Sequence, residues 1–281
     1  MRSDDQLPPP VNRSQAHSAR RYDFWLGGKD NFEVDRQSAR AIEAVFPSAR
    51  TAAWDNRRFV RRAVRHLAKA GVRQFVDVGC GLPAAYSADV HEVAQQVDPT
   101  ARVVYVDNDP MVLVHIRALL LGTPEGRVEF LDADLREPET ILGAPELADV
   151  LDLTQPVGLI LASVLDHIAD HDQARHAVRA LVDALPAGSY LALSHATTDF
   201  MTAEVAAELR EALSGEEFAP RCRAQVAEFF TGLNLIPPGL ATPGQWGDPA
   251  PTTGDQASVA AAYAGVARKP RTGESSREGQ P

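Results

Sequence analysis

A short glycine turn after an apolar segment carries the residues whose chemistry is most informative. The segment FVDVGCGLP, residues 75–83, places Asp77 two residues before Gly79 and four before Gly81. In an open α/β sheet, ligands bind at the carboxyl ends of the strands, and the turn after the first strand is the usual place. The segment therefore combines one carboxylate with bare backbone that a ligand can approach closely.

The glycine pattern alone fits two classes of ligand. The sequence GCGLPA, residues 79–84, also satisfies the loose G-x-G-x-x-G/A pattern of dinucleotide-binding folds. A pyrophosphate on this turn would bring negative oxygens close to Asp77, at a cost on the order of several kcal/mol in a partly dry site. S-adenosylmethionine (SAM) has no phosphate and carries a sulfonium and an ammonium, so charge favours SAM. An NAD(P)-dependent oxidoreductase remains the alternative, and Asp77 as a helix or turn cap is another.

Two further acids follow later strands. Asp107 ends the second apolar segment, where a carboxylate can accept both ribose hydroxyls of either cofactor. Asp134 ends the third, where it can accept from an adenine amine while Leu135 packs on the ring; the alternative for Asp134 is an N-cap of a helix near Glu137.

Methyl transfer needs no signature nucleophile, because holding the acceptor and the methyl group in line supplies much of the acceleration. A base would help if the acceptor is a hydroxyl or an amine. His167 and His195 follow the fourth and fifth strands and are the candidates, with packing or capping as the alternative for each. Ser163 is expected to line the pocket. A SAM-binding protein that transfers nothing is a further alternative, because no catalytic residue is evident.

Apolar segments alternate with amphipathic ones from residue 74 onward, which predicts an α/β fold with a parallel sheet. The expected strands are residues 74–79, 102–108, 127–134, 157–163 and 189–195, with helices at 85–97, 110–121 and 172–185. A helix at 202–213, a segment at 223–240 that passes from helix into a short strand, and a final β-rich run at 258–269 follow. The last two strands lack a helix between them and predict an antiparallel pair at the sheet edge.

The first 70 residues predict a separate helical segment. Residues 1–15 are expected to be disordered, 16–70 to form a helical cap interrupted at WLGGKDNF, 71–269 to form the SAM-binding domain, and 270–281 to be a disordered tail. Within the cap, Arg57, Arg61 and Arg65 share one helical row, which predicts a solvated face or, alternatively, an anion- or acceptor-binding face.

The amino-acid composition limits the kinds of molecule that the protein is expected to bind. The 28 basic and 38 acidic residues give a net charge of −10, which argues against a nucleic acid partner and favours small ones. The two cysteines, Cys80 and Cys222, sit in no metal-binding or disulfide pattern, so we expect no metal site. No apolar run approaches the roughly 18–20 residues that cross a bilayer, which predicts a cytoplasmic protein without a membrane partner. The sequence does not indicate an oligomeric state.

Several segments together resemble the bacterial SAM-dependent methyltransferase family DUF574, from about residue 16 to 269. They are RYDFWLGGKDNFEVDR, DNRRFVRRAVRHLAKAGVRQFVDVGCGLP, VHEVAQ, ARVVYVDNDPMVL, DADLREPETIL and GSYLALSHAT. The resemblance implies a Rossmann-like class I methyltransferase fold with a seven-stranded, mostly parallel sheet under an N-terminal helical cap. It also implies SAM contacts at Asp77, Gly79, Gly81, Asp107, Asn108 and Asp134, with Tyr22, Gly28, Lys29 and Arg57 contributed by the cap.

Two positions depart from the pattern of that family. Cys80 stands where threonine is more usual, which should leave SAM binding intact because the backbone of the turn makes the contact. Asp166, in SVLDHIAD, stands where histidine is more usual, which puts a histidine-based catalytic role at that position in doubt.

Overall fold

The computed structural model describes residues 12–83, 86–119, 121–213, 216–247 and 260–271. Most of the two segments expected to be disordered, 1–15 and 270–281, therefore lies outside the described residues. The same is true of the start of the helix expected at 85–97 and of the strand expected within 258–269.

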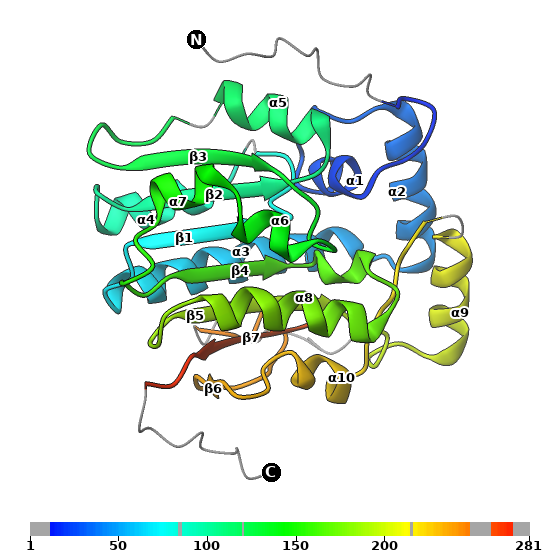
Figure 1. Ribbon diagram of the computed structural model, residues 1–281. Coiled ribbons are helices and arrows are strands. Elements are labelled where there is room, and N and C mark those ends of the chain that lie inside the picture. The colour runs from blue at the N-terminus through cyan, green and yellow to red at the C-terminus, as the bar shows by residue number, and fades with distance from the viewer. Residues whose placement is uncertain (1–11, 84–85, 120, 214–215, 248–259, 272–281) are drawn as a thin grey trace.

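The described strands form one seven-stranded sheet in the order β3-β2-β1-β4-β5-β7-β6 (Figure 1). β1 to β5 are parallel, and β7 runs antiparallel to both β5 and β6. This confirms the predicted mostly parallel sheet with an antiparallel pair at its edge. The bounds are β1 Gln74–Val78, β2 Arg102–Asp107, β3 Arg127–Asp132, β4 Gly158–Ala162, β5 Tyr190–Ala196, β6 Asn234–Leu235 and β7 Ala262–Arg268.

Strand order reverses beside β1, whose neighbours are β2 on one side and β4 on the other. The connection after β1 therefore leads toward one edge of the sheet, and the connection after β4 leads toward the other edge. A crevice opens between the carboxyl ends of these two strands. The glycine turn follows β1 directly, so it lies at this crevice.

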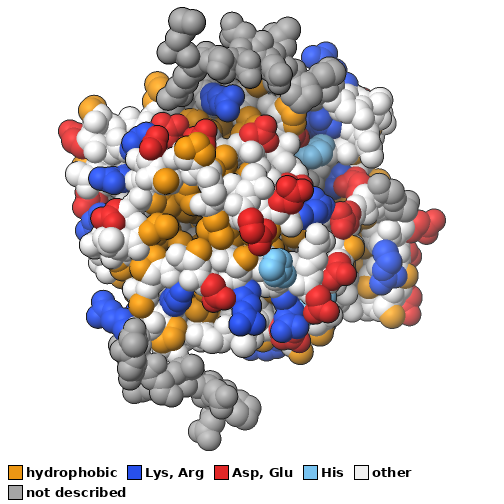
Figure 2. Space-filling model, in the orientation of Figure 1, with side chains coloured by type: hydrophobic (Ala, Val, Ile, Leu, Met, Phe, Trp, Pro, Cys, Tyr) orange, Lys and Arg blue, Asp and Glu red, His pale blue; other side chains and the backbone are white. Residues whose placement is uncertain are grey.

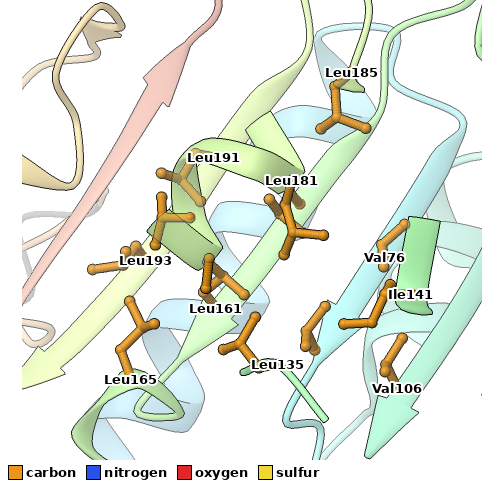
Figure 3. Packing of buried hydrophobic residues seen from close by; sticks show 14 of the residues in the cluster. Val76, Val106, Leu135, Ile141, Leu161, Leu165, Leu181, Leu185, Leu191 and Leu193 are labelled. Carbon is orange, nitrogen blue, oxygen red and sulfur yellow. The ribbon is translucent and has the colours of Figure 1, made fainter. Parts of the chain in front are cut away.

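Helices cover both faces of the sheet. One face packs against α3 (Ala49–Lys69), α4 (Val90–Val97) and α5 (Pro110–Leu119). The other packs against α6 (Pro138–Leu142), α7 (Pro145–Val150), α8 (His171–Ala184) and α10 (Arg223–Glu228). Figure 3 shows the core under α6 and α8, where side chains of the sheet, the helices and the turns between them meet: Val76, Val106, Leu135, Ile141, Leu161, Leu165, Leu181, Leu185, Leu191 and Leu193.

Local sequence explains where these helices begin. α8 starts after Asp170, whose side chain accepts the backbone N–H of Gln173 as an N-cap. α4 starts at Val90, five residues after the predicted start, because Asp89 and Glu92 form a capping box there. A periodic apolar pattern cannot locate such a cap by itself.

The N-terminal segment forms α1 (Ser18–Trp25), α2 (Glu33–Val45) and α3. α1 and α2 lie with α9 (Ala203–Ala212) at the carboxyl ends of the parallel strands (Figure 1). A buried ion pair between Arg20 and Asp35, 2.9 Å apart, joins α1 to α2. α3 has a second role, because its apolar row, which includes Phe59, Val64 and Leu67, is fully buried against the sheet.

The surface offers two further observations. On the face drawn in Figure 2, acidic and basic side chains are interspersed around an apolar area. In the part of the chain that the structure describes, no helix is both long and apolar enough to cross a bilayer.

Candidate active site

A cavity of about 830 Å³ opens at the carboxyl edge of the sheet. Its walls come from the turns after β1 to β5, from α1 to α3, and from α9 and the segment after it. Ligand-binding pockets typically have volumes of about 300–1,000 Å³, so the cavity is large enough for a cofactor-sized ligand.

The glycine turn forms one wall of this cavity. Gly79 has φ +70°, and a Cβ there would lie 2.2 Å from Cγ2 of Val164, so the turn needs glycine for both its backbone conformation and its packing. Gly81 has φ +66°, but a Cβ on it would meet nothing within 4 Å. Gly79 thus allows the turn after β1 to pack closely against Val164 in the turn after β4, whereas the space beside Gly81 is open.

Asp107 holds this turn in place. Its Oδ2 accepts the N–H of Gly81 at 2.9 Å, and its Oδ1 accepts the N–H of Asp109 at 3.0 Å. Burial raises the pKa of Asp107, while these two backbone N–H groups oppose the rise. The Cys80 thiol is a further, weak donor to Oδ2, with Sγ 3.8 Å away. Because a carboxylate has about four acceptor sites, Asp107 can still accept from a ligand hydroxyl.

Asp77 is 5% exposed and lines the cavity. Burial raises its pKa to about 7, although the nearby Arg57 guanidinium opposes this. Arg57 is itself 9% exposed and forms an ion pair with Asp89, so the prediction of a solvated face is wrong for Arg57. The spacing of the three arginines correctly indicates that they share one side of α3. It could not show that the other helices of the cap cover this part of α3.

Asn108, Asp134 and Leu135 form a neighbouring part of the wall. The Asn108 amide donates to Asp134 at 2.9 Å, and the Arg136 backbone N–H donates to the same carboxylate at 2.8 Å. Partial burial raises the pKa of Asp134, but these donors and the Arg136 guanidinium outweigh it, so the pKa is lowered. Asp134 therefore caps its own turn and lines the cavity. The alternative interpretation, an N-cap of the helix near Glu137, is wrong, because the N-cap of α6 is Glu137 itself.

A series of hydrogen bonds between polar side chains joins the cap to the end of β4. Asn56 on α3 donates to Ser163 at 3.1 Å and to the Tyr22 hydroxyl at 3.1 Å, and it accepts from Ser194 at 2.6 Å. Tyr22 donates to the carbonyl of Ala53. Ser163 has φ +52°, a conformation that is uncommon for a residue other than glycine and is often associated with functional sites.

The structure does not bring Gly28 or Lys29 into the wall of the cavity. A Cβ on Gly28 would lie 1.8 Å from Oδ1 of Asp23, and Lys29 is exposed. Asp23 accepts from the Asp30 N–H and the Asn31 amide and so fixes the GGKDN loop, while facing the cavity itself. The geometry thus favours Asp23, which the sequence did not single out, over Gly28 and Lys29.

The two candidate histidines lie in different surroundings. His167 lines the cavity, and its Nδ1 lies 3.1 Å from the carbonyl oxygen of Glu217. His195 is fully buried, its Nε2 lies 2.7 Å from Arg221, and its Nδ1 lies 2.8 Å from the carbonyl oxygen of Ala196. Both ring nitrogens of His195 are therefore engaged, which favours the packing interpretation for it.

One half of the cavity was not predicted from the sequence. Apolar side chains of the cap and of the region around α9 face one another there, and we call them the apolar half: Trp25, Ile42, Phe46, Ala49, Ala52, Met201, Leu209, Leu213, Phe218 and Ala261. The amphipathic pattern of 202–213 indicated a helix with an apolar side. Only the folded chain places that side against α2.

Comparisons with known proteins assign the family. A family model for S-adenosyl methyltransferases matches residues 4–270. The protein belongs to this family. A search of curated proteins found no match.

Solved structures agree with this assignment. A DUF574 family protein from Streptomyces avermitilis is 41% identical, with a TM-score of 0.88 over 93% of this chain and 100% of the other. A protein from Thermobifida fusca is 38% identical, with a TM-score of 0.83 over 95% and 100% of the two chains. A plantazolicin methyltransferase in complex with S-adenosylhomocysteine (SAH), 11% identical, shares the fold at a TM-score of 0.50 over 89% and 95%.

These findings confirm the resemblance to DUF574 and the class I methyltransferase fold. The protein is a SAM-dependent methyltransferase, and its cofactor is SAM. The family assignment therefore favours SAM over the nicotinamide alternative that the glycine pattern alone left open.

Proposed function

We propose that this methyltransferase acts on a hydroxyl or amine of a small, largely apolar acceptor. The observation that carries the proposal is the apolar half of the cavity, which adjoins the glycine turn within one continuous space. Methyl transfer requires the acceptor and the cofactor to meet in line in a closed site. One cavity with a polar half and an apolar half can hold two such ligands side by side.

The polar half fits SAM. When bound, SAM supplies an electrophilic methyl group on a cationic sulfur. Asp77, which accepts no hydrogen bond from the described residues, can bind the ammonium or face the sulfonium, and Asp107 can accept from the ribose. Gly79 and Gly81 allow the backbone to approach the ligand, and Asp134 with Leu135 can hold the adenine.

Side chains from the cap and from β4 complete this assignment. Tyr22, Arg57 and Ser163 line the same half, and Asn108 fixes Asp134. Their proposed part is to orient the cofactor and to exclude water.

The charged side chains in the cavity wall indicate which net charge an acceptor can carry. Each arginine in the cavity wall forms an ion pair: Arg20 with Asp35, Arg21 with Glu216, Arg57 with Asp89, and Arg136 with Asp134 and Glu217. Among the described residues, the lining carboxylates without an ion pair to arginine or lysine are Asp23, Asp77, Asp107, Asp109 and Asp166. The cavity thus carries an excess of negative charge, which favours a neutral or cationic acceptor over an anionic one such as a nucleic acid.

The test measures transfer of labelled methyl groups from SAM to a panel of phenols, naphthols and aromatic amines, with acidic peptides and RNA as further acceptors. Ala52→Phe fills the apolar half and should lower turnover at least tenfold while leaving SAH affinity unchanged. Ala41→Phe, on the exposed side of α2, is the matched control and should behave like the wild type. Turnover of peptide or RNA alone, or full activity of Ala52→Phe, would contradict the proposal.

A further inference from the structure

Asp166 is a buried carboxylate that lines the cavity. It lies in the 3-10 turn η1 (Leu165–His167) after β4 and is 4% exposed. Its Oδ1 accepts the backbone N–H of Ala196 at 2.9 Å and lies 3.0 Å from Nδ1 of His195. Its Oδ2 accepts no hydrogen bond from the described residues. One carboxylate oxygen is thus fixed, and the other is available to a ligand.

His195 and Arg221 support this carboxylate from the side away from the cavity. An arginine can only donate, so Nε2 of His195 accepts from Arg221 and the ring proton resides on Nδ1. Nδ1 donates to the carbonyl oxygen of Ala196 at 2.8 Å and lies 3.0 Å from Oδ1 of Asp166. Burial lowers the pKa of His195, which keeps the ring neutral. Arg221 is held in turn by the carbonyl oxygens of Leu165 at 3.0 Å and Ile168 at 2.7 Å. The N–H of Ala196 and the fixed ring of His195 beside Oδ1 together hold Asp166 in one orientation.

Asp166 also lies where the two halves of the cavity meet. Its backbone carbonyl accepts the N–H of Ala219, next to Phe218 of the apolar half. On the polar side it lies near Tyr22: burial raises the pKa of Tyr22 to about 12, and the negative charge of Asp166 adds to that rise. An acceptor in the apolar half must present its reactive atom at this junction to reach a cofactor in the polar half.

We propose that Asp166 binds the reactive group of the acceptor and receives its proton, an inference that rests on the proposed function. The acceptor's oxygen or nitrogen forms the bond to the methyl carbon. The carbon–sulfur bond breaks with its electron pair staying on sulfur, and the acceptor's O–H or N–H proton passes to the carboxylate of Asp166. The proton then leaves to solvent, and His195 and Arg221 act as positioning residues.

His167 is less well placed for this role. Its backbone carbonyl accepts from Arg136, which pairs with Asp134, and its ring lies near Glu217. The Arg136 contacts place His167 beside the part of the wall assigned to the nucleoside, and the carbonyl oxygen of Glu217 already engages one of its ring nitrogens.

The kinetic test compares Asp166→Asn with Asp199→Asn, a carboxylate that follows β5 but lies outside the cavity wall. Asp166→Asn keeps the shape but cannot take a proton, so kcat should fall by about 10²- to 10⁴-fold. SAH affinity, measured by calorimetry, should stay within about threefold and shows that the variant is folded. Asp166→Glu should recover at least tenfold of the loss. Asp166→Ser is measured in the same way if Asp166→Asn does not bind SAH.

A binding test reads the same contact without turnover. With SAH bound, 2-naphthol should bind the wild type at least tenfold more tightly than 2-methoxynaphthalene, which lacks the O–H. In Asp166→Asn this preference should disappear.

The outcomes separate the two proposals. Activity of Asp166→Asn within threefold of the wild type, or a naphthol preference that survives the substitution, would overturn the role of Asp166 and leave the proposed function standing. If the wild type methylates no member of the panel and binds neither naphthalene probe, the proposed function fails, and the role of Asp166 fails with it.

Discussion

At the scale of single residues, cofactor recognition depends most directly on Asp77 and Asp107. Both are buried carboxylates at the ends of neighbouring parallel strands, β1 and β2, yet their partners differ. Asp107 is held by two backbone N–H groups, whereas Asp77 has only the charge of the nearby Arg57 to oppose the effect of its burial. A cationic ligand should therefore stabilise the ionised form of Asp77 more than the ionised form of Asp107.

We predict that SAM affinity depends on the protonation of Asp77. Its pKa of about 7 in the ligand-free protein means that the carboxylate loses its charge as the pH falls below 7. Because a cation favours the ionised form, affinity should fall by up to about tenfold for each pH unit below 7. Calorimetry from pH 5.5 to 7 measures this. Asp77→Asn should bind more weakly at pH 7 and show no such slope; an equal slope in both proteins would contradict the assignment.

Asp107→Asn should weaken SAH binding by about 10- to 150-fold, since a hydrogen bond to a charged group contributes about 1.5–3 kcal/mol. The new amide would also point its NH₂ group at the N–H of either Gly81 or Asp109. Asp132→Asn is the control, because Asp132 is exposed and lies outside the cavity wall. Titration calorimetry that finds equal SAH affinity in the two variants would remove the ribose role of Asp107.

Residue positions that follow strands could be predicted from sequence, and others could not. Asp77, Asp107 and Asp134 all line the cavity, because the end of a parallel strand fixes the edge of the sheet at which a residue lies. Gly28 and Lys29 had no such constraint, and Asp23 lies nearer the cavity than either. The contact between His195 and Arg221 joins positions 26 residues apart, so no local sequence pattern could predict it.

At the scale of elements, the turn after β1 and the turn after β4 depend on each other. Val164 packs against the backbone of Gly79, and both turns line the cavity. Ser163, next to Val164, has φ +52°. The contact thus links the loop that would approach the cofactor to the turn that carries Asp166.

The two glycines of the first turn should differ in their tolerance of alanine. Gly81→Ala meets open space and should lower the free energy of unfolding by about 1–2 kcal/mol, the cost of a positive φ. Gly79→Ala adds a clash with Val164 and should cost about 1–3 kcal/mol more. Denaturant titration measures both. Equal losses in the two variants would show that Val164 does not pack against Gly79 as described.

The parallel strands were predictable because runs of Val, Ile and Leu buried on both faces are typical of them. The start of α4 was less predictable, because the Asp89–Glu92 capping box outweighed the apolar periodicity before it. The contact of α2 with α9 joins segments about 170 residues apart, so the apolar half could not be found from either helix alone.

At the scale of the whole molecule, the cap encloses the cavity from the side opposite the sheet edge. Arg21 of α1 forms a bidentate ion pair with Glu216, and Arg50 donates to the carbonyl oxygens of Phe24 and Trp25. These contacts attach α1 both to the segment after α9 and to α3. A ligand held between the cap and the sheet should therefore stabilise both.

Hydrogen exchange should report this enclosure. On SAH addition, the amides of residues 20–35 should exchange several-fold more slowly, most strongly at 20–26, where the side chains line the cavity. α8, which packs on the far side of the core, is the internal control and should not change. Unchanged exchange across 20–35 would mean that the cap takes no part in cofactor binding.

A crystal structure with SAH bound tests the arrangement of the whole site most directly. We predict an arrangement with the ribose hydroxyls on Asp107, the amino group near Asp77, and the sulfur facing Asp166 and the apolar half. A ligand whose ribose lies away from Asp107, or whose sulfur points away from the apolar half, would contradict it.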